Sequence, residues 1–144
     1  MDDTDRAILR ALTANGRATA SQIGREVNLS VPAAAARIRK LEEAGVILKY
    51  TVRLNREKTG RNLLAFLLIG VRSDYIDAFR SSVVLFPNVL ECHHIAGEYD
   101  YLIKAAARDT AELEEFLGAL KKMEGILRSN TIITLATLKE ELNG

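Results

Sequence analysis

The sequence predicts an α+β protein in which an N-terminal winged helix-turn-helix is followed by a C-terminal ferredoxin-like βαββαβ domain. One observation is a series of short helical patterns with cap signals between Asp3 and Gly45. A second is the alternation of strand and helix patterns from Leu63 onward. The third is charge: residues 1–60 contain 11 Lys or Arg and 7 Asp or Glu, whereas residues 61–144 contain 9 and 12. A basic N-terminal part is typical of a nucleic-acid surface.

The first domain, residues 1–54, begins with two short helices. The pattern over 3–15 places apolar residues on one face and acidic residues near the positive end of the helix dipole. The second helix begins at Thr19, which is expected to form a capping box with Gln22. It ends at Asn28, a residue type that tolerates the left-handed conformation of a turn.

A third helix begins at Ser30, directly after this turn, and Gly45 ends it. Two helices joined by a tight turn predict a helix-turn-helix. The next residues, 46–54, alternate between the two faces of a strand and are expected to form the wing. Residues 55–62 are charged and contain Gly60, which predicts a hinge.

The second domain, residues 63–144, is expected to fold as one βαββαβ unit. Its predicted strands are 63–71, 89–95, 99–107 and 126–138, and its two helices begin at the caps Asp74 and Asp109. The continuously apolar run 63–71 is typical of a strand buried on both faces or in an interface. Such a unit leaves one face of its sheet without helices, so a partner is expected to cover that face.

Several motifs resemble the Lrp/AsnC family of prokaryotic transcription regulators, the feast/famine proteins, over essentially the whole chain. They are "DDTDRAILRALTANGRAT", "LSVPAAAARIRKLEEAGVILKYTVRLN", "IAGEYDYLIK" and "NTIITLATLK". The resemblance implies a helix-turn-helix hinged to a ligand-sensing domain, in homodimers that assemble further into octamers of four dimers.

The third helix is expected to enter the major groove of double-stranded DNA. Its candidate DNA-contacting residues are Ser30, Val31, Ala33, Arg37, Arg39 and Lys40. Because Ile38 and Leu41 fix the buried side, Arg37 and Lys40 are expected to face solvent, with Arg39 flanking them. Many members of the family carry an arginine at the position of Ala36, and alanine forms no hydrogen bond to a base. Binding is therefore expected to depend on phosphates and DNA shape, with modest sequence preference.

The segment "GEYDY" suits the two charges of an amino acid, because glycine exposes backbone amides and the acidic side chains attract an ammonium group. In the family, the effector pocket lies between dimers, around this loop, the start of the next helix and the last strand. The matching positions here are Gly97, Glu98, Tyr99, Asp100, Asp109, Thr110, Ile133 and Thr134. A small or hydrophobic amino acid is the expected effector.

No metal or cofactor is expected. Cys92, His93 and His94 are consecutive on a strand, so neighbouring side chains point to opposite faces. The acidic N-terminus and the lack of a long apolar run favour a cytoplasmic protein without a membrane span. Two alternatives to a regulator stay open. One is an enzyme that resembles the siroheme decarboxylases, and the other is an architectural DNA-binding protein that needs no ligand.

Overall fold

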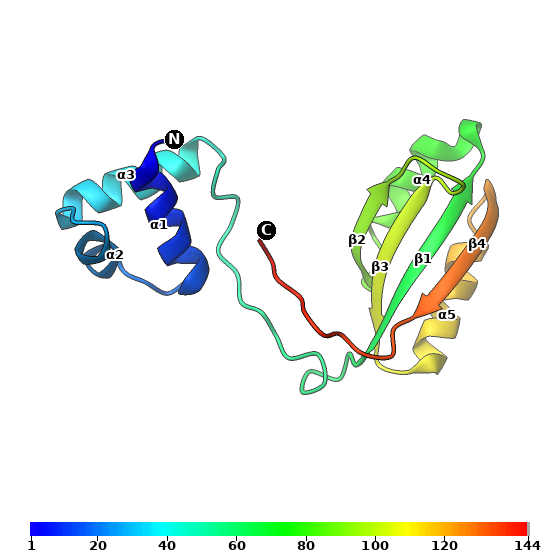
Figure 1. Cartoon of the computed structure of the whole chain (residues 1–144). Coiled ribbons are helices and arrows are strands. Elements are labelled where there is room, and N and C mark those ends of the chain that lie inside the picture. The colour runs from blue at the N-terminus through cyan, green and yellow to red at the C-terminus, as the bar shows by residue number, and fades with distance from the viewer. Residues whose placement is uncertain (144) are drawn as a thin grey trace. The chain divides into compact units, whose positions relative to one another are not determined.

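The computed structural model describes residues 1–143 and divides into two compact units, formed mainly by Met1–Arg53 and by Leu54–Glu140 (Figure 1). The first unit contains helices α1 (Asp3–Ala14), α2 (Ala20–Glu26) and α3 (Val31–Glu43). Their apolar faces meet in a small core formed by Ile8, Ala11, Ile23 and Leu41. No helix in the described part of the chain is long and apolar enough to cross a membrane.

The turn between α2 and α3 follows from the local sequence. Thr19 and Gln22 form the expected capping box at the start of α2. Asn28 has a positive φ of 56°, which turns the chain sharply towards the Ser30 cap of α3. At Gly24 the turn and α3 pack closely on α2, because an added Cβ would lie 2.7 Å from the carbonyl oxygen of Leu29 and 3.6 Å from the Cβ of Ala34. The helix-turn-helix expected from the sequence is confirmed.

The wing strand expected over 46–54 is wrong for this structure. The segment is extended but belongs to no sheet, and Leu48, Val52 and Leu54 are exposed. An alternating pattern creates a strand only when a second strand is present to accept its hydrogen bonds. The described part of the chain supplies no such strand here.

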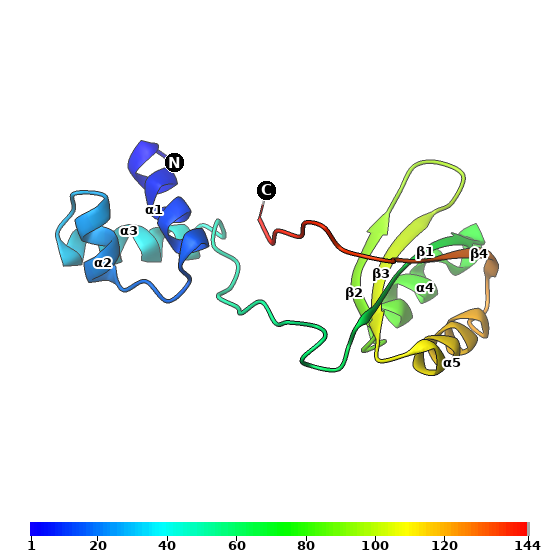
Figure 2. The same cartoon turned by 60° about the horizontal axis from the view of Figure 1, so that its bottom comes forward.

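The second unit has a four-stranded antiparallel sheet in the order β2-β3-β1-β4. The strands are β1 (Leu63–Val71), β2 (Val89–His94), β3 (Tyr101–Ala107) and β4 (Ile126–Ile133). A short 3-10 turn, η1 (Ser73–Tyr75), leads into α4 (Ile76–Val83), and α5 (Thr110–Lys121) follows β3. Figure 2 shows both helices on the same side of the sheet. The βαββαβ prediction is confirmed.

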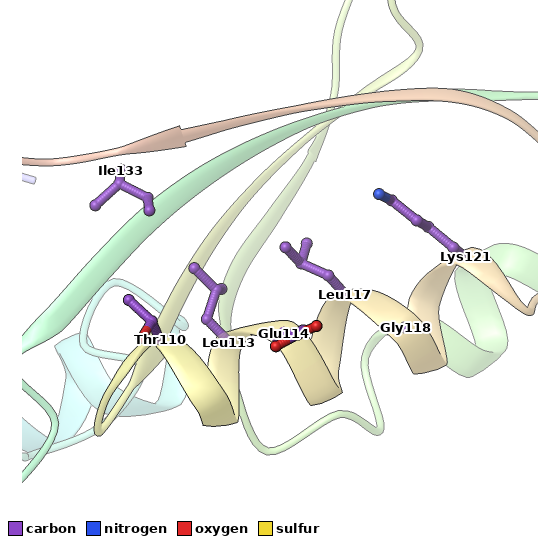
Figure 3. A pocket seen from close by; sticks show the side chains of 7 residues that line it. All are labelled: Thr110, Leu113, Glu114, Leu117, Gly118, Lys121 and Ile133. Atoms are coloured by element: carbon purple, nitrogen blue, oxygen red, sulfur yellow. The ribbon is translucent and has the colours of Figure 1, made fainter.

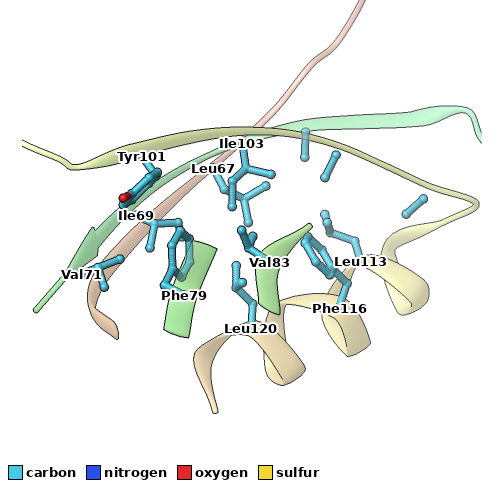
Figure 4. Close-up of a cluster of buried hydrophobic side chains, with 13 residues drawn as sticks. Leu67, Ile69, Val71, Phe79, Val83, Tyr101, Ile103, Leu113, Phe116 and Leu120 are labelled. Carbon is cyan, nitrogen blue, oxygen red and sulfur yellow. The ribbon is translucent and has the colours of Figure 1, made fainter. Parts of the chain in front are cut away.

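The core of this unit lies between the helices and one face of the sheet (Figure 4). Phe79 and Val83 of α4 and Phe116 and Leu120 of α5 pack there against alternate residues of β1 and β3. Ring contacts extend this packing, with the centres of Phe79 and Tyr101 4.7 Å apart.

Several element boundaries differ from the sequence-based expectation, including that of β3, which begins at Tyr101 instead of residue 99. Asp74 does not cap a helix: it lies within η1, and its carboxylate pairs with Arg72. Arg72 thus binds the oxygens that would have capped α4. Strand β4 ends at Ile133 instead of residue 138: Thr134 still donates its amide and its hydroxyl to the carbonyl of Leu64, but the chain bends at Leu135.

Residues 134–140, here called the C-terminal strap, cross part of the sheet face that lacks helices (Figure 2). The strap is fixed at its far end by Glu140, whose carboxylate accepts from Lys104 Nζ at 2.6 Å and from Arg56 at 2.5 Å. Beneath it lies a hollow of about 320 Å³ lined in part by Leu64, Phe66 and Lys104. Leu135 and Leu138 are fully exposed, and Leu138 lies at the rim of this hollow.

The Glu140 contacts predict a pH dependence. Hydrogen bonds from Arg56 and Lys104 lower the pKa of Glu140 from 4.5 to about 2. This group therefore stabilises the fold above pH 4.5, and the contribution is lost as the pH falls from 4.5 towards 2. We expect Glu140→Gln to be less stable than wild type at pH 6, with the difference shrinking towards pH 3 in thermal melts. Glu124→Gln, at an exposed carboxylate, is the matched control. If the difference in melting temperature between wild type and Glu140→Gln stayed the same from pH 6 to pH 3, the assignment would be contradicted.

Candidate DNA-binding face and effector half-sites

The exposed side of α3 carries residues at helical spacing. These are Pro32, Ala36, Arg39, Lys40 and Glu43. Ala34 and Leu41 lie on the opposite side and are buried. The orientation expected for the basic residues is thus partly wrong: Arg39, expected at the flank, lies at the middle of the exposed face. Lys40 is exposed as expected, and Val31 is half-exposed at the start of the helix.

Arg37 does not point into the solvent as expected. Its Nη1 lies 2.7 Å from Asp2 Oδ2 and 2.8 Å from Asp5 Oδ1, so it ties α3 to the first turn of α1. The Asp5 amide and Arg37 together lower the pKa of Asp2 to about 2, which keeps this carboxylate charged. Arg37 is therefore a structural residue within the helical unit, and it leaves Arg39 and Lys40 as the cations of the exposed face.

The sequence held a signal for this contact. Asp2 and Asp5 form a capping box at the start of α1, in which each carboxylate accepts the backbone N–H of the other. Within the sequence, the position of these acids indicates only a favourable interaction with the helix dipole. What the sequence does not show is that the tertiary fold brings an arginine 32 residues away onto the pair.

The start of α3 is arranged as expected for a phosphate contact. The Ser30 hydroxyl oxygen accepts from the amide of Ala33 at 3.3 Å, which leaves its O–H free to donate. Ala33 is half-buried, so it offers less surface than predicted. Backbone amides at a helix N-terminus favour an anion, so the Ser30 end of α3 suits a phosphate group.

Cys92, His93 and His94 do not form a common site. His93 lies 3.0 Å from Glu91 on the sheet face without helices. His94 points the other way, stacks on Tyr101 with ring centres 5.1 Å apart, and contacts Arg80. Cys92 packs against the core, and burial raises the pKa of its thiol. Within residues 1–143, no three His, Cys, Asp or Glu side chains gather to hold a metal ion.

The residues Gly97, Glu98, Tyr99 and Asp100, here called the loop half-site, connect β2 to β3. Asp100 fixes the end of this loop, because its carboxylate accepts from the amide of Val71 at 2.7 Å. It is therefore held by the backbone, and its carboxylate is less available to a ligand than expected. Gly97 has a positive φ of 155°, which side chains rarely adopt, so glycine suits this turn.

The second set comprises Asp109, Thr110, Ile133 and Thr134, here called the groove half-site. Asp109 caps α5 by accepting from the amide of Glu112 at 2.8 Å. Thr110 and Ile133 line a hollow of about 350 Å³ between α5 and β4, with Leu113, Glu114, Leu117, Gly118 and Lys121 (Figure 3). The floor of this hollow is apolar, and its lining includes the acidic Glu114 and the basic Lys121.

The two half-sites lie at opposite ends of the sheet. The loop half-site adjoins the pair Ile69 and Tyr101, whereas the groove half-site adjoins Leu64, which accepts from Thr134. Five residues of β1 separate these points, which is about 16 Å along a strand. One chain therefore does not bring the eight predicted effector residues into one pocket.

A helix-turn-helix unit joined to a βαββαβ unit is the architecture of a two-domain transcription regulator. Comparison with known proteins gives the same division. Residues 1–47 match the family model for a winged helix-turn-helix DNA-binding domain, and residues 64–143 match that for the Lrp/AsnC ligand-binding domain. The chain belongs to the Lrp/AsnC family of transcriptional regulators.

Individual relatives and solved structures agree with this placement. The chain is 33% identical over 140 residues to the HTH-type transcriptional regulator FL11 of Pyrococcus furiosus, covering 97% of this chain and 93% of that one. It is 33% identical to the leucine-responsive regulatory protein of Rhizobium meliloti, with 97% and 90% covered. A Neisseria meningitidis transcriptional regulator in complex with L-Met superposes with a TM-score of 0.95, at 31% identity and with 99% and 94% covered. A feast or famine regulatory protein from M. tuberculosis complexed with L-methionine gives 0.93, at 31% identity and with 99% and 97% covered.

Proposed function

We propose that this regulator binds double-stranded DNA through the exposed face of α3, with Arg39 and Lys40 as its principal cations. The observation that carries the proposal is that these two side chains are exposed on α3 while Arg37 is tied to α1. Ala36, also on the exposed face, can touch a thymine methyl group but cannot read a base by hydrogen bonding. Phosphate contacts and DNA shape therefore dominate, and sequence preference is modest.

We propose further that the active form is a homodimer in which two copies pack their open sheet faces together. Leu68 and Leu102 are register partners on that face; both are half-buried, and neither lines the hollow beneath the strap. The exposed Leu135 and Leu138 of the strap add further apolar surface. A two-fold interface suits this face, because each copy offers the same apolar strip to the other.

The proposed dimer interface predicts that a charged substitution at Leu68 strongly weakens self-association. We expect Leu68→Asp to weaken self-association at least about 100-fold, because an unpaired carboxylate in an apolar interface costs several kcal/mol. Sedimentation velocity of the full chain measures it. Val84→Asp is the matched control, since Val84 is 64% exposed at the end of α4, on the side of the sheet that the helices cover. A Leu68→Asp protein that sediments like wild type would contradict the proposed interface.

The proposed effector is a small or hydrophobic amino acid bound where the loop half-site of one protomer meets the groove half-site of another. Three observations support this. The half-sites are about 16 Å apart within one chain, the groove floor is apolar, and two similar structures are described as complexes with L-methionine. Because each protomer carries both half-sites, dimers can associate further, and an octamer of four dimers is the assembly we propose. The protein would act in the cytoplasm.

A tetrapyrrole-processing enzyme is the less favoured alternative. His93 and His94 kept it open, but they point to opposite faces of the sheet and have separate partners. We therefore propose that the chain is not an enzyme. Mixing the protein with siroheme tests this, and an unshifted absorption band is the expected result.

The DNA-binding proposal is tested by a salt titration on the protein's own upstream DNA and on unrelated DNA. We expect tighter binding to the upstream fragment, with both affinities falling steeply as salt rises. Equal affinity for both fragments would favour the architectural protein, and no binding at low salt would overturn the assignment.

A further inference from the structure

Arg128 links strand β4, strand β1 and the loop half-site at one end of the sheet. It is a β4 residue in register with Gly70 of β1. Its side chain passes directly over Gly70, because a Cβ added there would lie 3.0 Å from Arg128 Cγ. The missing side chain at Gly70 therefore leaves a path for the arginine across β1, on the open face of the sheet.

The guanidinium group of Arg128 ends on the loop half-site. It lies 4.4 Å from the centre of the Tyr99 ring, a distance typical of a cation–π contact. Its Nη1 is 3.3 Å from a carboxylate oxygen of Glu98, and its other amino group donates to the Glu98 carbonyl. Both side chains are open to solvent, at 48% and 78% exposure. An exposed ion pair of this kind is weak and exchanges partners at low cost.

The middle of the loop has unused hydrogen-bond donors beside this guanidinium. Hydrogen bonds fix both ends of the loop, from Ile95 N to Asp100 O and from Asp100 N to Ile69 O. Between them, within the described residues, the amides of residues 96–99 donate no hydrogen bond to the protein. Backbone amides next to an arginine form a suitable site for a carboxylate.

We infer that Arg128 binds the α-carboxylate of the effector, taking it in place of Glu98, and that the released Glu98 carboxylate accepts the α-ammonium group. This inference rests on the proposed amino-acid response. An amino acid carries both charges on neighbouring atoms, so it can insert between the two members of the ion pair. Tyr99 keeps the guanidinium plane in position during the exchange, and Asp100 holds the loop through Val71 without contacting the ligand.

The exchange provides a link to assembly. Arg128 and Gly70 lie on the face that we propose a second copy covers. A ligand that changes the position of this side chain changes that face, and its binding energy is thereby coupled to association.

The test measures ligand binding by calorimetry on the full chain. Each of the twenty standard L-amino acids is titrated, and the tightest binder is carried forward with its α-amide, which lacks the carboxylate. Arg128→Gln is compared with wild type and with Arg6→Gln, a matched control that removes an exposed, ion-paired arginine from α1. Arg128→Lys keeps the charge without the planar donor pair.

We expect Arg128→Gln to bind the acid on the order of 10- to 100-fold more weakly, as for loss of a charge-assisted hydrogen bond. The variant should bind acid and amide equally, whereas wild type and Arg6→Gln prefer the acid. Arg128→Lys should retain part of the preference. If Arg128 only supported the loop, the variant would lose acid and amide binding by the same factor, and that result would overturn the inference. If Arg128→Gln bound the acid as tightly as wild type does, the inference would also be overturned, but the proposed effector function would stand. No binding of any amino acid to wild type would overturn both.

Discussion

Replacing Arg39 and Lys40 together with glutamine is expected to lower DNA affinity at least about 100-fold near physiological salt, because each protomer loses two cations and a good side-chain contact to a base is worth about 1–3 kcal/mol. Both side chains are exposed on α3, and a dimer loses four charges. If all four contact phosphates, the slope of log affinity against log salt should become shallower by roughly 3–4. Fluorescence anisotropy with a labelled duplex over a salt series measures both quantities.

The matched control for this experiment removes the same charge from α1. Arg6 and Arg10 are exposed there, outside the α3 face, so Arg6→Gln with Arg10→Gln should change the slope little. Arg37→Gln should behave differently again, by lowering the thermal stability of the helical unit through loss of its contacts with Asp2 and Asp5. Equal loss of affinity in the Arg39/Lys40 and Arg6/Arg10 variants would show that the α3 face is not the DNA contact.

Truncating Ile8 to alanine is expected to unfold the helical unit while the sheet unit stays folded. Ile8 is fully buried in the small core with Ala11, Ile23 and Leu41. Removing a buried isoleucine side chain costs about 2–5 kcal/mol, which is a large part of the stability of a domain of this size. Circular dichroism during urea unfolding should show the first transition move to lower urea, and DNA binding should be lost.

Self-association supplies the internal control for Ile8→Ala, because the proposed interface lies in the Leu54–Glu140 unit. The variant should keep the oligomeric mass of wild type, as measured by sedimentation equilibrium. Leu9→Ala, at a residue that only packs against the same core, should have a smaller effect. A single unfolding transition shared by both units, or normal DNA binding by Ile8→Ala, would contradict the independence of the units.

Local features of the fold were readable from the sequence, because they depend on residues close together in the chain. The Thr19–Gln22 capping box, the left-handed Asn28 and the Asp109 cap all follow from spacing within one turn. Asp74 shows the limit of such reasoning. It has the right residue type for a cap, but Arg72 binds its carboxylate instead.

Features that depend on distant residues could not be predicted in the same way. The wing pattern over 46–54 is regular, yet within the described residues no strand pairs with it. Arg37 was expected in the groove because the acidic pair at α1 is far away in sequence. The positions that the resemblance implies fall on the loop before β3, the start of α5 and the end of β4 with the residue after it, but only the strand register shows that these places lie at opposite ends of the sheet. Arg128 gave no signal at all, since its role depends on Gly70 in a neighbouring strand.

The most direct test of the account is whether amino acids change DNA binding by the full chain. Affinity for the protein's own upstream fragment is measured by anisotropy at fixed salt, with each standard L-amino acid in turn, for wild type and Arg128→Gln. We expect at least one small or hydrophobic amino acid to change the wild-type affinity several-fold and to have little effect on Arg128→Gln. Identical affinities with and without every amino acid would contradict the account and indicate an architectural protein that binds DNA without a ligand.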